Sequence, residues 1–191
     1  MRIVAGRHKG RRLESPGGQG TRPPSDRARE SIFNVIQHGL ADWQGSLEDA
    51  SVVDVFSGTG ALGLEALSRG AAHGSFIERD RDALAVLRAN IARLDRTADS
   101  RVIAGDALNL ASWRDAPASL MFADAPYGSG DGLAAAGQLA RIGALAPGAL
   151  VILETGASEQ TEPEAVAGCG MTPIDTRRYG RARLHFLQAA D

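Results

Sequence analysis

Short apolar runs alternate with longer amphipathic stretches between residues 51 and 156. Apolar runs that are bounded by Gly, Pro or charged residues are typical of strands buried on both faces. The pattern predicts five such strands, at residues 51–56, 73–78, 100–106, 119–126 and 148–156. Between them, apolar residues recur at helical spacing and predict helices at residues 61–70, 80–94 and about 131–145.

The order of these elements predicts an α/β fold. Strands that alternate with helices form a parallel sheet through right-handed crossovers, with helices on both faces. After residue 170 the pattern changes, because residues 171–180 and 181–188 flank Gly180 with no helix between them. This arrangement is typical of a β-hairpin. We therefore expect a doubly wound, Rossmann-like sheet that is closed by a C-terminal antiparallel hairpin.

The first forty residues differ from this core. Residues 2–14 alternate short apolar and basic pieces and predict a small hairpin, and the Gly and Pro content of residues 14–25 predicts a loop. Residues 26–39 predict a helix whose apolar face carries Ile32, Phe33 and Ile36. At 191 residues we expect one domain, with a basic N-terminal extension at residues 1–40 and a catalytic core at residues 51–191.

The net charge of −2 conceals an uneven distribution. Residues 1–30 hold eight basic and three acidic residues, a balance of +5, so the rest of the chain must carry −7. A basic arm on an acidic body favours a polyanionic partner, because phosphate contacts supply much of the affinity for nucleic acid. A solvated charged segment is the alternative. The candidate RNA-binding residues are Arg7, Lys9, Arg11, Arg12, Arg22, Arg27 and Arg29.

Other features of the composition exclude several classes of protein. No apolar run reaches the roughly 18 residues that a membrane-spanning helix needs, and the basic N-terminus does not resemble a secretory signal. The single cysteine, Cys169, excludes a disulfide framework and a cysteine-rich metal site. The four histidines are scattered without ligand spacing. We therefore expect a metal-free, monomeric protein of the cytoplasm.

Acidic residues stand at the ends of four successive predicted strands. They are Asp54, Glu78, Asp106 and Asp124. In an open parallel sheet, ligands bind outside the carboxyl ends of the strands. A carboxylate at the end of a buried strand is costly to desolvate unless it meets a donor. One such acid could be a helix cap, but four are better explained by a shared ligand.

A glycine-rich turn follows the first of these strands. Gly58, Gly60 and Gly63 match the dinucleotide-binding fingerprint, with Glu78 about 20 residues further on. The glycines allow the backbone to approach a ligand closely, and Glu78 can bind a ribose diol. Both features suit any adenosine cofactor, so a nicotinamide-dependent oxidoreductase remains one alternative.

Two later features favour a different cofactor. Asp106 is placed to accept a hydrogen bond from an adenine amino group. The segment Asp124-Ala125-Pro126-Tyr127 resembles the Asp/Asn-Pro-Pro-Tyr/Phe signature of S-adenosylmethionine-dependent amino-methyltransferases. The signature does not name the acceptor, so DNA adenine and protein glutamine remain alternatives to RNA. The chain lacks a sizeable extra domain for DNA target recognition.

The chemistry of such an acceptor explains these residue types. An amino group on a base ring is a poor nucleophile because its lone pair is delocalised. The Asp124 side chain and a neighbouring carbonyl can hold its two N–H groups and turn the lone pair towards the methyl group. Tyr127 would stack on the extruded base. Positioning and electrostatics would supply most of the catalysis.

Four stretches together, TRPPSDRARESIFNVI, DVFSGTGALGLEALSRGA, FIERD and FADAPY, resemble the RsmD family along nearly the whole chain. These are bacterial 16S rRNA guanine-N2 methyltransferases with a class I methyltransferase fold. The resemblance implies S-adenosylmethionine as cofactor and 16S rRNA as partner, within the small ribosomal subunit or its assembly intermediate. It implies a catalytic group of Asp124, Pro126 and Tyr127, and a cofactor pocket lined by Asp54, Phe56, Gly58, Gly60, Glu78, Arg79, Asp106 and Ala107. Arg22, Pro23, Asp26, Arg27, Arg29 and Glu30 match an N-terminal motif that faces RNA.

Two positions depart from the family pattern. Ala125 replaces the usual first proline of the signature, so the carbonyl that accepts from the base amine is held less rigidly. We expect the chemistry to be retained but slower; a non-catalytic RNA-binding protein is the alternative that Ala125 favours. Pro24 stands where the family usually has Thr. Four arginines near Gly180, at positions 177, 178, 181 and 183, either extend an RNA-binding face or form a solvated hairpin tip.

Overall fold

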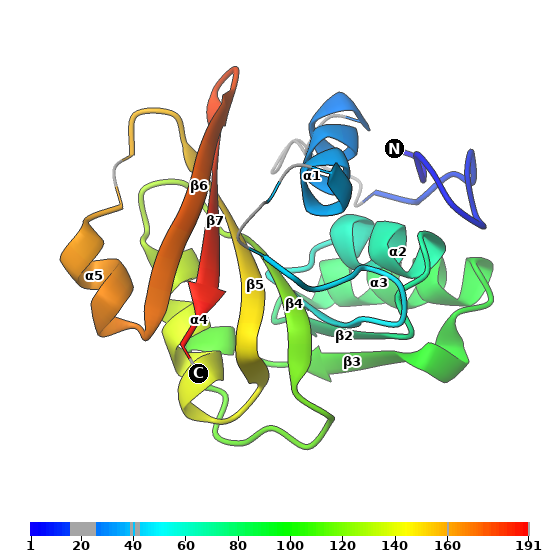
Figure 1. The fold of residues 1–191 in the computed structure, drawn as a ribbon. Coiled ribbons are helices and arrows are strands. Elements are labelled where there is room, and N and C mark those ends of the chain that lie inside the picture. The colour runs from blue at the N-terminus through cyan, green and yellow to red at the C-terminus, as the bar shows by residue number, and fades with distance from the viewer. Residues whose placement is uncertain (16–25, 39, 41–42, 160, 191) are drawn as a thin grey trace.

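The computed structural model describes residues 1–15, 26–38, 40, 43–159 and 161–190 (Figure 1). Within these residues, seven strands form one sheet in the order β3-β2-β1-β4-β5-β7-β6. The strands are β1 Ser51–Val55, β2 His73–Glu78, β3 Ser100–Ala104, β4 Ala118–Asp124, β5 Leu145–Gly156, β6 Met171–Tyr179 and β7 Ala182–Ala189. The first five are parallel, and the β6–β7 hairpin adds antiparallel strands beside β5. This confirms the predicted doubly wound sheet and its terminal hairpin.

Helices cover both faces of the sheet (Figure 1). They are α1 Asp26–His38, α2 Ala61–Ser68, α3 Arg81–Arg93, α4 Asp131–Arg141 and α5 Pro163–Gly168, with short 3₁₀ turns η1 Thr97–Asp99 and η2 Ala107–Asn109. The first three pack on one face and α4 and α5 on the other. No helix in the described part of the chain is long and apolar enough to cross a membrane.

The apolar runs of the central strands are explained by burial on both faces. Along β4, Leu120 and Phe122 belong to the core beneath α1, α2 and α3. The alternate residues Met121 and Ala123 belong to the core beneath α4 and α5. Because successive strand side chains point to opposite faces, every position of such a strand is apolar until the strand reaches the edge of the sheet.

Two elements differ from the sequence-based expectation. The helix predicted at residues 131–145 ends at Arg141, because Gly143 adopts a left-handed conformation with φ of 72° that terminates helices. Residues 144 and 145 already pair with the start of β4. The short helix α5 was not predicted, because Val166 is its only buried residue and gives no helical periodicity.

The predicted N-terminal hairpin is confirmed and is fastened to α2. Arg2 and Arg12 form its antiparallel bridge. The backbone N–H groups of Val4 and Ala5 donate to the carboxylate of Glu65, at 2.7 and 2.9 Å. Glu65 is completely buried and also accepts from the guanidinium Nε of Arg69 at 2.8 Å. The N-terminal hairpin is therefore bonded directly to helix α2.

Candidate active site

The predicted strand-end acids gather at one edge of the sheet. Asp54 lies one residue before the end of β1, and Glu78 and Asp124 are the last residues of β2 and β4. Since β2, β1 and β4 are adjacent and parallel, these three carboxylates lie close enough for Glu78 and Asp124 to influence the pKa of Asp54. Asp106 lies outside this group, two residues beyond β3 on the outer strand of the sheet.

Asp54 is the most deeply buried of these acids. Its side chain is 2% exposed, and its Oδ2 atom accepts a 2.8 Å hydrogen bond from the backbone N–H of Gly63 in the first turn of α2. Burial raises the pKa of Asp54 to about 8; the Gly63 N–H opposes this effect, while Asp124 and Glu78 add to it. The bond fixes α2 against β1 directly beneath the glycine turn.

The glycine turn has three left-handed residues, Phe56, Gly58 and Gly60, with φ angles of 57°, 52° and 79°. A Cβ atom at Gly60 would stand 2.5 Å from Leu87, and one at Gly63 would stand 2.4 Å from Phe76. These two glycines therefore allow α2 to pack closely. At Gly58 a Cβ would meet nothing nearer than a carbonyl oxygen 4.0 Å away, so its backbone borders open space where a ligand can lie.

Glu78 connects the second strand to this turn. Its Oε2 atom accepts from the Gly58 N–H at 2.8 Å, and its Oε1 atom accepts from the N–H groups of Arg79 and Asp80, each at 2.8 Å. A carboxylate offers about four acceptor positions, so one remains for a ligand hydroxyl. The carboxylate is thus held in a fixed orientation beside the open side of Gly58.

Asp106 has a local structural role. Its carboxylate caps η2 by accepting from the Leu108 N–H at 3.0 Å, and it accepts from the Asn109 side chain at 3.0 Å. Arg79 forms an ion pair with it at 3.6 Å. These interactions account for an acidic residue at this position without a ligand. The contact of Asp106 with an adenine ring therefore stays a prediction. Ala107, next to it, is buried.

Asp124 faces a second carboxylate, which the sequence analysis missed. Asp124 and Glu154 are register partners on β4 and β5. Tyr127 donates its hydroxyl to Glu154 Oε1 at 2.7 Å, while its ring is 52% exposed. Burial and the neighbouring Glu154 raise the pKa of Asp124 to about 7. Burial also raises the pKa of Glu154, and the Tyr127 hydroxyl opposes that rise.

The turn after Asp124 is held without the proline that Ala125 replaces. Ala125 is 7% exposed and packs near the start of α4, where a Cβ at Gly132 would stand 3.8 Å from its methyl group. Ser129 donates its hydroxyl to the Pro126 carbonyl at 2.8 Å. Packing and this hydrogen bond fix the backbone that carries Tyr127.

Comparison with known proteins identifies the family. A family model described as conserved hypothetical protein 95 matches residues 1–188. The chain belongs to this family, the RsmD family. The chain is 38% identical over 130 residues to ribosomal RNA small subunit methyltransferase D of Escherichia coli (strain K12); the match covers 68% of this chain and 62% of that protein.

Solved structures share the fold of this chain. The Escherichia coli protein yhhF superposes with a TM-score of 0.81 and 31% identity, covering 100% of this chain and 98% of that chain. SMU.776, whose structure contains SAH, shares the fold at 15% identity with a TM-score of 0.67; the match covers 88% of this chain and 50% of that chain.

Most of the basic residues that the structure describes in the N-terminal segment are exposed to solvent. Arg7, Lys9, Arg11 and Arg12 are exposed on the hairpin. Arg29 is completely buried, and its Nη2 atom donates to the Arg2 carbonyl at 2.5 Å. The structure therefore contradicts an RNA contact by Arg29, whose place on the apolar face of α1 makes it an anchor. Arg22 and the side chain of Arg27 lie outside the described residues.

Asn90 on α3 is a further residue that the sequence analysis missed. Its side chain is completely buried. It donates to the carbonyl oxygens of Thr59 at 3.0 Å and Glu14 at 3.2 Å, and it accepts from the Glu14 N–H at 2.8 Å. The Asn90 side chain therefore connects Glu14, just after the N-terminal hairpin, to the glycine turn.

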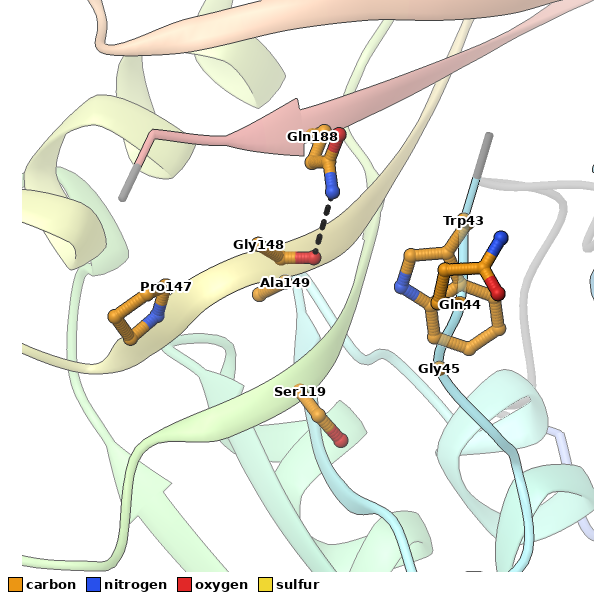
Figure 2. A pocket seen from close by; sticks show the side chains of 8 residues that line it. All are labelled: Trp43, Gln44, Gly45, Ser119, Pro147, Gly148, Ala149 and Gln188. Atoms are coloured by element: carbon orange, nitrogen blue, oxygen red, sulfur yellow. Dashed lines mark hydrogen bonds between the residues drawn. The ribbon is translucent and has the colours of Figure 1, made fainter. Parts of the chain in front are cut away.

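A cavity of about 300 Å³ lies at the opposite edge of the sheet, by the amino-terminal ends of β4 and its neighbours (Figure 2). It is lined by Trp43, Gln44, Gly45, Ser119, Pro147, Gly148, Ala149 and Gln188. Gln188 donates to the Gly148 carbonyl at 3.5 Å across one side of it. None of the predicted site residues lines this cavity, so it is separate from the acidic edge.

Proposed function

We propose that the protein is an S-adenosylmethionine-dependent methyltransferase that methylates the exocyclic N2 amino group of one guanine in 16S rRNA. The observation that carries the proposal is the position of Asp124. Asp124 is the last residue of β4 and lies near Asp54 and opposite Glu154. The exposed ring of Tyr127 follows three residues later. Membership of the RsmD family and the name of the Escherichia coli relative support the reaction and the RNA substrate.

The acidic edge fits this cofactor. S-adenosylmethionine supplies a methyl group on a positively charged sulfur, which keeps the electron pair of the broken carbon–sulfur bond. Glu78 and the partly ionised Asp124 give the edge the opposite charge, and Gly58 leaves room for a ligand. The fold relative SMU.776 was solved with SAH. The residues that would hold the cofactor are Asp54, Phe56, Gly58, Gly60, Glu78, Arg79, Asp106 and Ala107.

Asp124 is the proposed catalytic residue. Its carboxylate accepts a hydrogen bond from one N2–H of guanine, and the adjacent carbonyl of Ala125 accepts from the other. The N2 lone pair is thereby directed towards the methyl carbon, with which it forms the new bond. The Asp124 carboxylate then takes the proton that N2 loses. With a pKa of about 7, Asp124 is partly ionised near neutral pH. The positively charged sulfur of a bound S-adenosylmethionine would favour the ionised form.

Tyr127 and the hairpin provide the proposed contacts to RNA. The Tyr127 ring is exposed beside Asp124 and suits stacking on an extruded base. The exposed cations Arg7, Lys9 and Arg11, with Arg12, would bind phosphates of the flanking RNA. Arg22 and Arg27 belong to the same proposal. The substrate would be 16S rRNA in the small subunit or its assembly intermediate, and the enzyme a cytoplasmic monomer.

A dinucleotide-dependent oxidoreductase fits the structure less well. In Rossmann-type enzymes the pyrophosphate lies on the N-terminus of the helix that follows the glycine turn. Here the buried carboxylate of Asp54 accepts the N–H of Gly63 in that turn of α2. A diphosphate bound there would lie next to the acidic side chains of Asp54, Glu78 and Asp124, which disfavour an anion.

The proposal is tested by methyl transfer from labelled S-adenosylmethionine to small ribosomal subunits that lack the modification. Large subunits, DNA containing adenine and a glutamine-containing protein acceptor serve as parallel substrates. We expect label in small-subunit RNA alone. Label in DNA or protein would reassign the acceptor, and cofactor binding without transfer to any substrate would favour a non-catalytic role.

A further inference from the structure

Glu154 is a carboxylate of this edge that the proposed reaction does not yet use. It lies on β5, in register with Asp124 on β4. Phe122 and Ile152, two residues earlier on each strand, pack in the core beneath α1 and α2. Because side chains two apart share a face, both carboxylates project to that same face, separated by one strand spacing of about 4.8 Å.

The two oxygens of Glu154 are in different situations. Oε1 accepts the hydroxyl of Tyr127 at 2.7 Å. Among the described residues, no donor is bonded to Oε2. The Tyr127 bond orients the Glu154 side chain against the repulsion of Asp124, and it leaves one carboxylate oxygen available next to the group that receives the base amine.

The edges of the RNA bases differ in what they present beside an amino group. In guanine, the N2 amino group is next to the ring N1–H, which is a second donor. In adenine and cytosine the amino group is next to a ring nitrogen acceptor, and uracil has no amino group. When both are ionised, two adjacent carboxylates are acceptors only, so they complement the donor–donor edge of guanine and no other base.

We propose that Glu154 selects guanine, by accepting the N1–H of the base whose N2 amino group is bound by Asp124. This inference rests on the proposed function and assigns the base specificity to one residue. Adenine in the same position would bring the lone pair of its N1 against the Glu154 carboxylate and leave that half-buried acceptor unpaired once the base excludes water from it. Unpaired buried polar groups are the strongest source of discrimination between similar substrates.

The test uses 2-aminopurine, which keeps the amino group of guanine but has an acceptor at N1. Small subunits are reconstituted with 16S rRNA that carries guanine or 2-aminopurine at the modified position. The wild-type enzyme should prefer guanine by about 100-fold in kcat/KM, the range that a missing hydrogen bond to a charged group gives. In Glu154→Gln the amide can donate to N1 of 2-aminopurine. The preference should therefore fall by at least about 10-fold, with SAH affinity unchanged.

Two variants separate base selection from a structural role. Tyr127→Phe keeps the ring but removes the hydroxyl that orients Glu154; because the Glu154 carboxylate remains, the preference for guanine should fall by less than it does in Glu154→Gln. Glu164→Gln, on the exposed surface of α5, should leave both activities at the wild-type level. Glu154→Ala removes both the attraction to guanine and the repulsion of 2-aminopurine, so it should also lower the preference and provides a second test if the Gln variant does not fold.

The outcomes are distinct. A preference that collapses in the Glu154 variants and is partly retained in Tyr127→Phe supports the inference. Equal losses on both bases in the Glu154 variants would overturn it and leave Glu154 a structural residue. A wild-type enzyme that methylates no guanine would contradict the proposed function itself, and the inference with it.

Discussion

The carboxylate of Glu78 accepts the backbone N–H of Gly58 at 2.8 Å, so the end of β2 is bonded to the turn that follows β1. Two further N–H groups, from Arg79 and Asp80, hold the other carboxylate oxygen. The acid at the second strand therefore shapes the glycine turn as well as offering an acceptor to a ligand.

Replacing Glu78 should weaken cofactor binding through both effects. Glu78→Ala removes the acceptor for the ribose and releases the Gly58 turn, and we expect SAH affinity to fall by about 10- to 100-fold, equivalent to one or two hydrogen bonds to a charged group. Isothermal titration calorimetry measures this directly. Glu164→Ala on α5 is the control. If both variants bound SAH with equal affinity, Glu78 would not be part of the cofactor pocket.

Asp124 should affect the chemistry more than the binding of the cofactor. In Asp124→Asn the side chain keeps an acceptor oxygen but loses the charge that takes up the proton, and in Asp124→Ala both are lost. We expect turnover to fall by about 100-fold or more in the Ala variant, the size of a general-base or electrostatic contribution. SAH affinity should stay within a few-fold. A variant that kept most of its turnover would contradict the catalytic role.

Asp54 should make stability depend on pH. Its folded-state pKa of about 8 lies above the unfolded value of 3.8. Between these values the folded protein retains a proton that the unfolded chain has released, so the free energy of unfolding decreases as pH rises through this range. Asp54→Asn keeps the acceptor for Gly63 without the charge. The variant should gain roughly 4 kcal/mol relative to wild type between pH 5 and pH 8.

Urea unfolding of wild type and Asp54→Asn at pH 5, 6.5 and 8 measures this difference. Asp124 titrates in both proteins, so its contribution largely cancels when the two curves are subtracted. A stability difference that stays constant with pH would mean that Asp54 is ionised throughout and that burial does not control its pKa.

The exposed arginines of the hairpin should contribute to RNA affinity. Arg11→Glu with Arg12→Glu should weaken binding to 16S rRNA and lower the slope of log affinity against log salt by about 2, one for each lost phosphate contact. SAH affinity should not change. Arg141→Glu, on α4 at the other face of the sheet, is the matched control. An unchanged salt slope in the double variant would show that the arm does not bind phosphate.

The cluster of Asp54, Glu78 and Asp124 could be predicted because the carboxyl ends of parallel strands meet at one edge. Glu154 obeys the same rule but was missed; like Asp54 it lies before the last residue of its strand, and β5 continues to Gly156. Its position opposite Asp124 depends on strand register. That register shifts between Ala118 and Leu120, which no sequence pattern shows.

Counting charges misled the sequence analysis at Arg29. Arg29 contributes to the basic balance of the arm, but it lies three and four residues before Ile32 and Phe33 and shares their buried face. Helical periodicity could have placed it there. The predicted contact of Asp106 with the cofactor stays a prediction, because its carboxylate also caps η2. A local cap and a ligand-binding acid have the same sequence signature, so only coordinates separate them.

The most direct test of the central claim is the identity of the methylated nucleoside. Small subunits lacking the modification are incubated with the enzyme and labelled S-adenosylmethionine, and the 16S rRNA is digested and analysed by mass spectrometry. We predict N2-methylguanosine as the labelled nucleoside, at one position, and its absence with Asp124→Ala. Label on any other nucleoside, or equal labelling by the Asp124→Ala variant, would contradict the account.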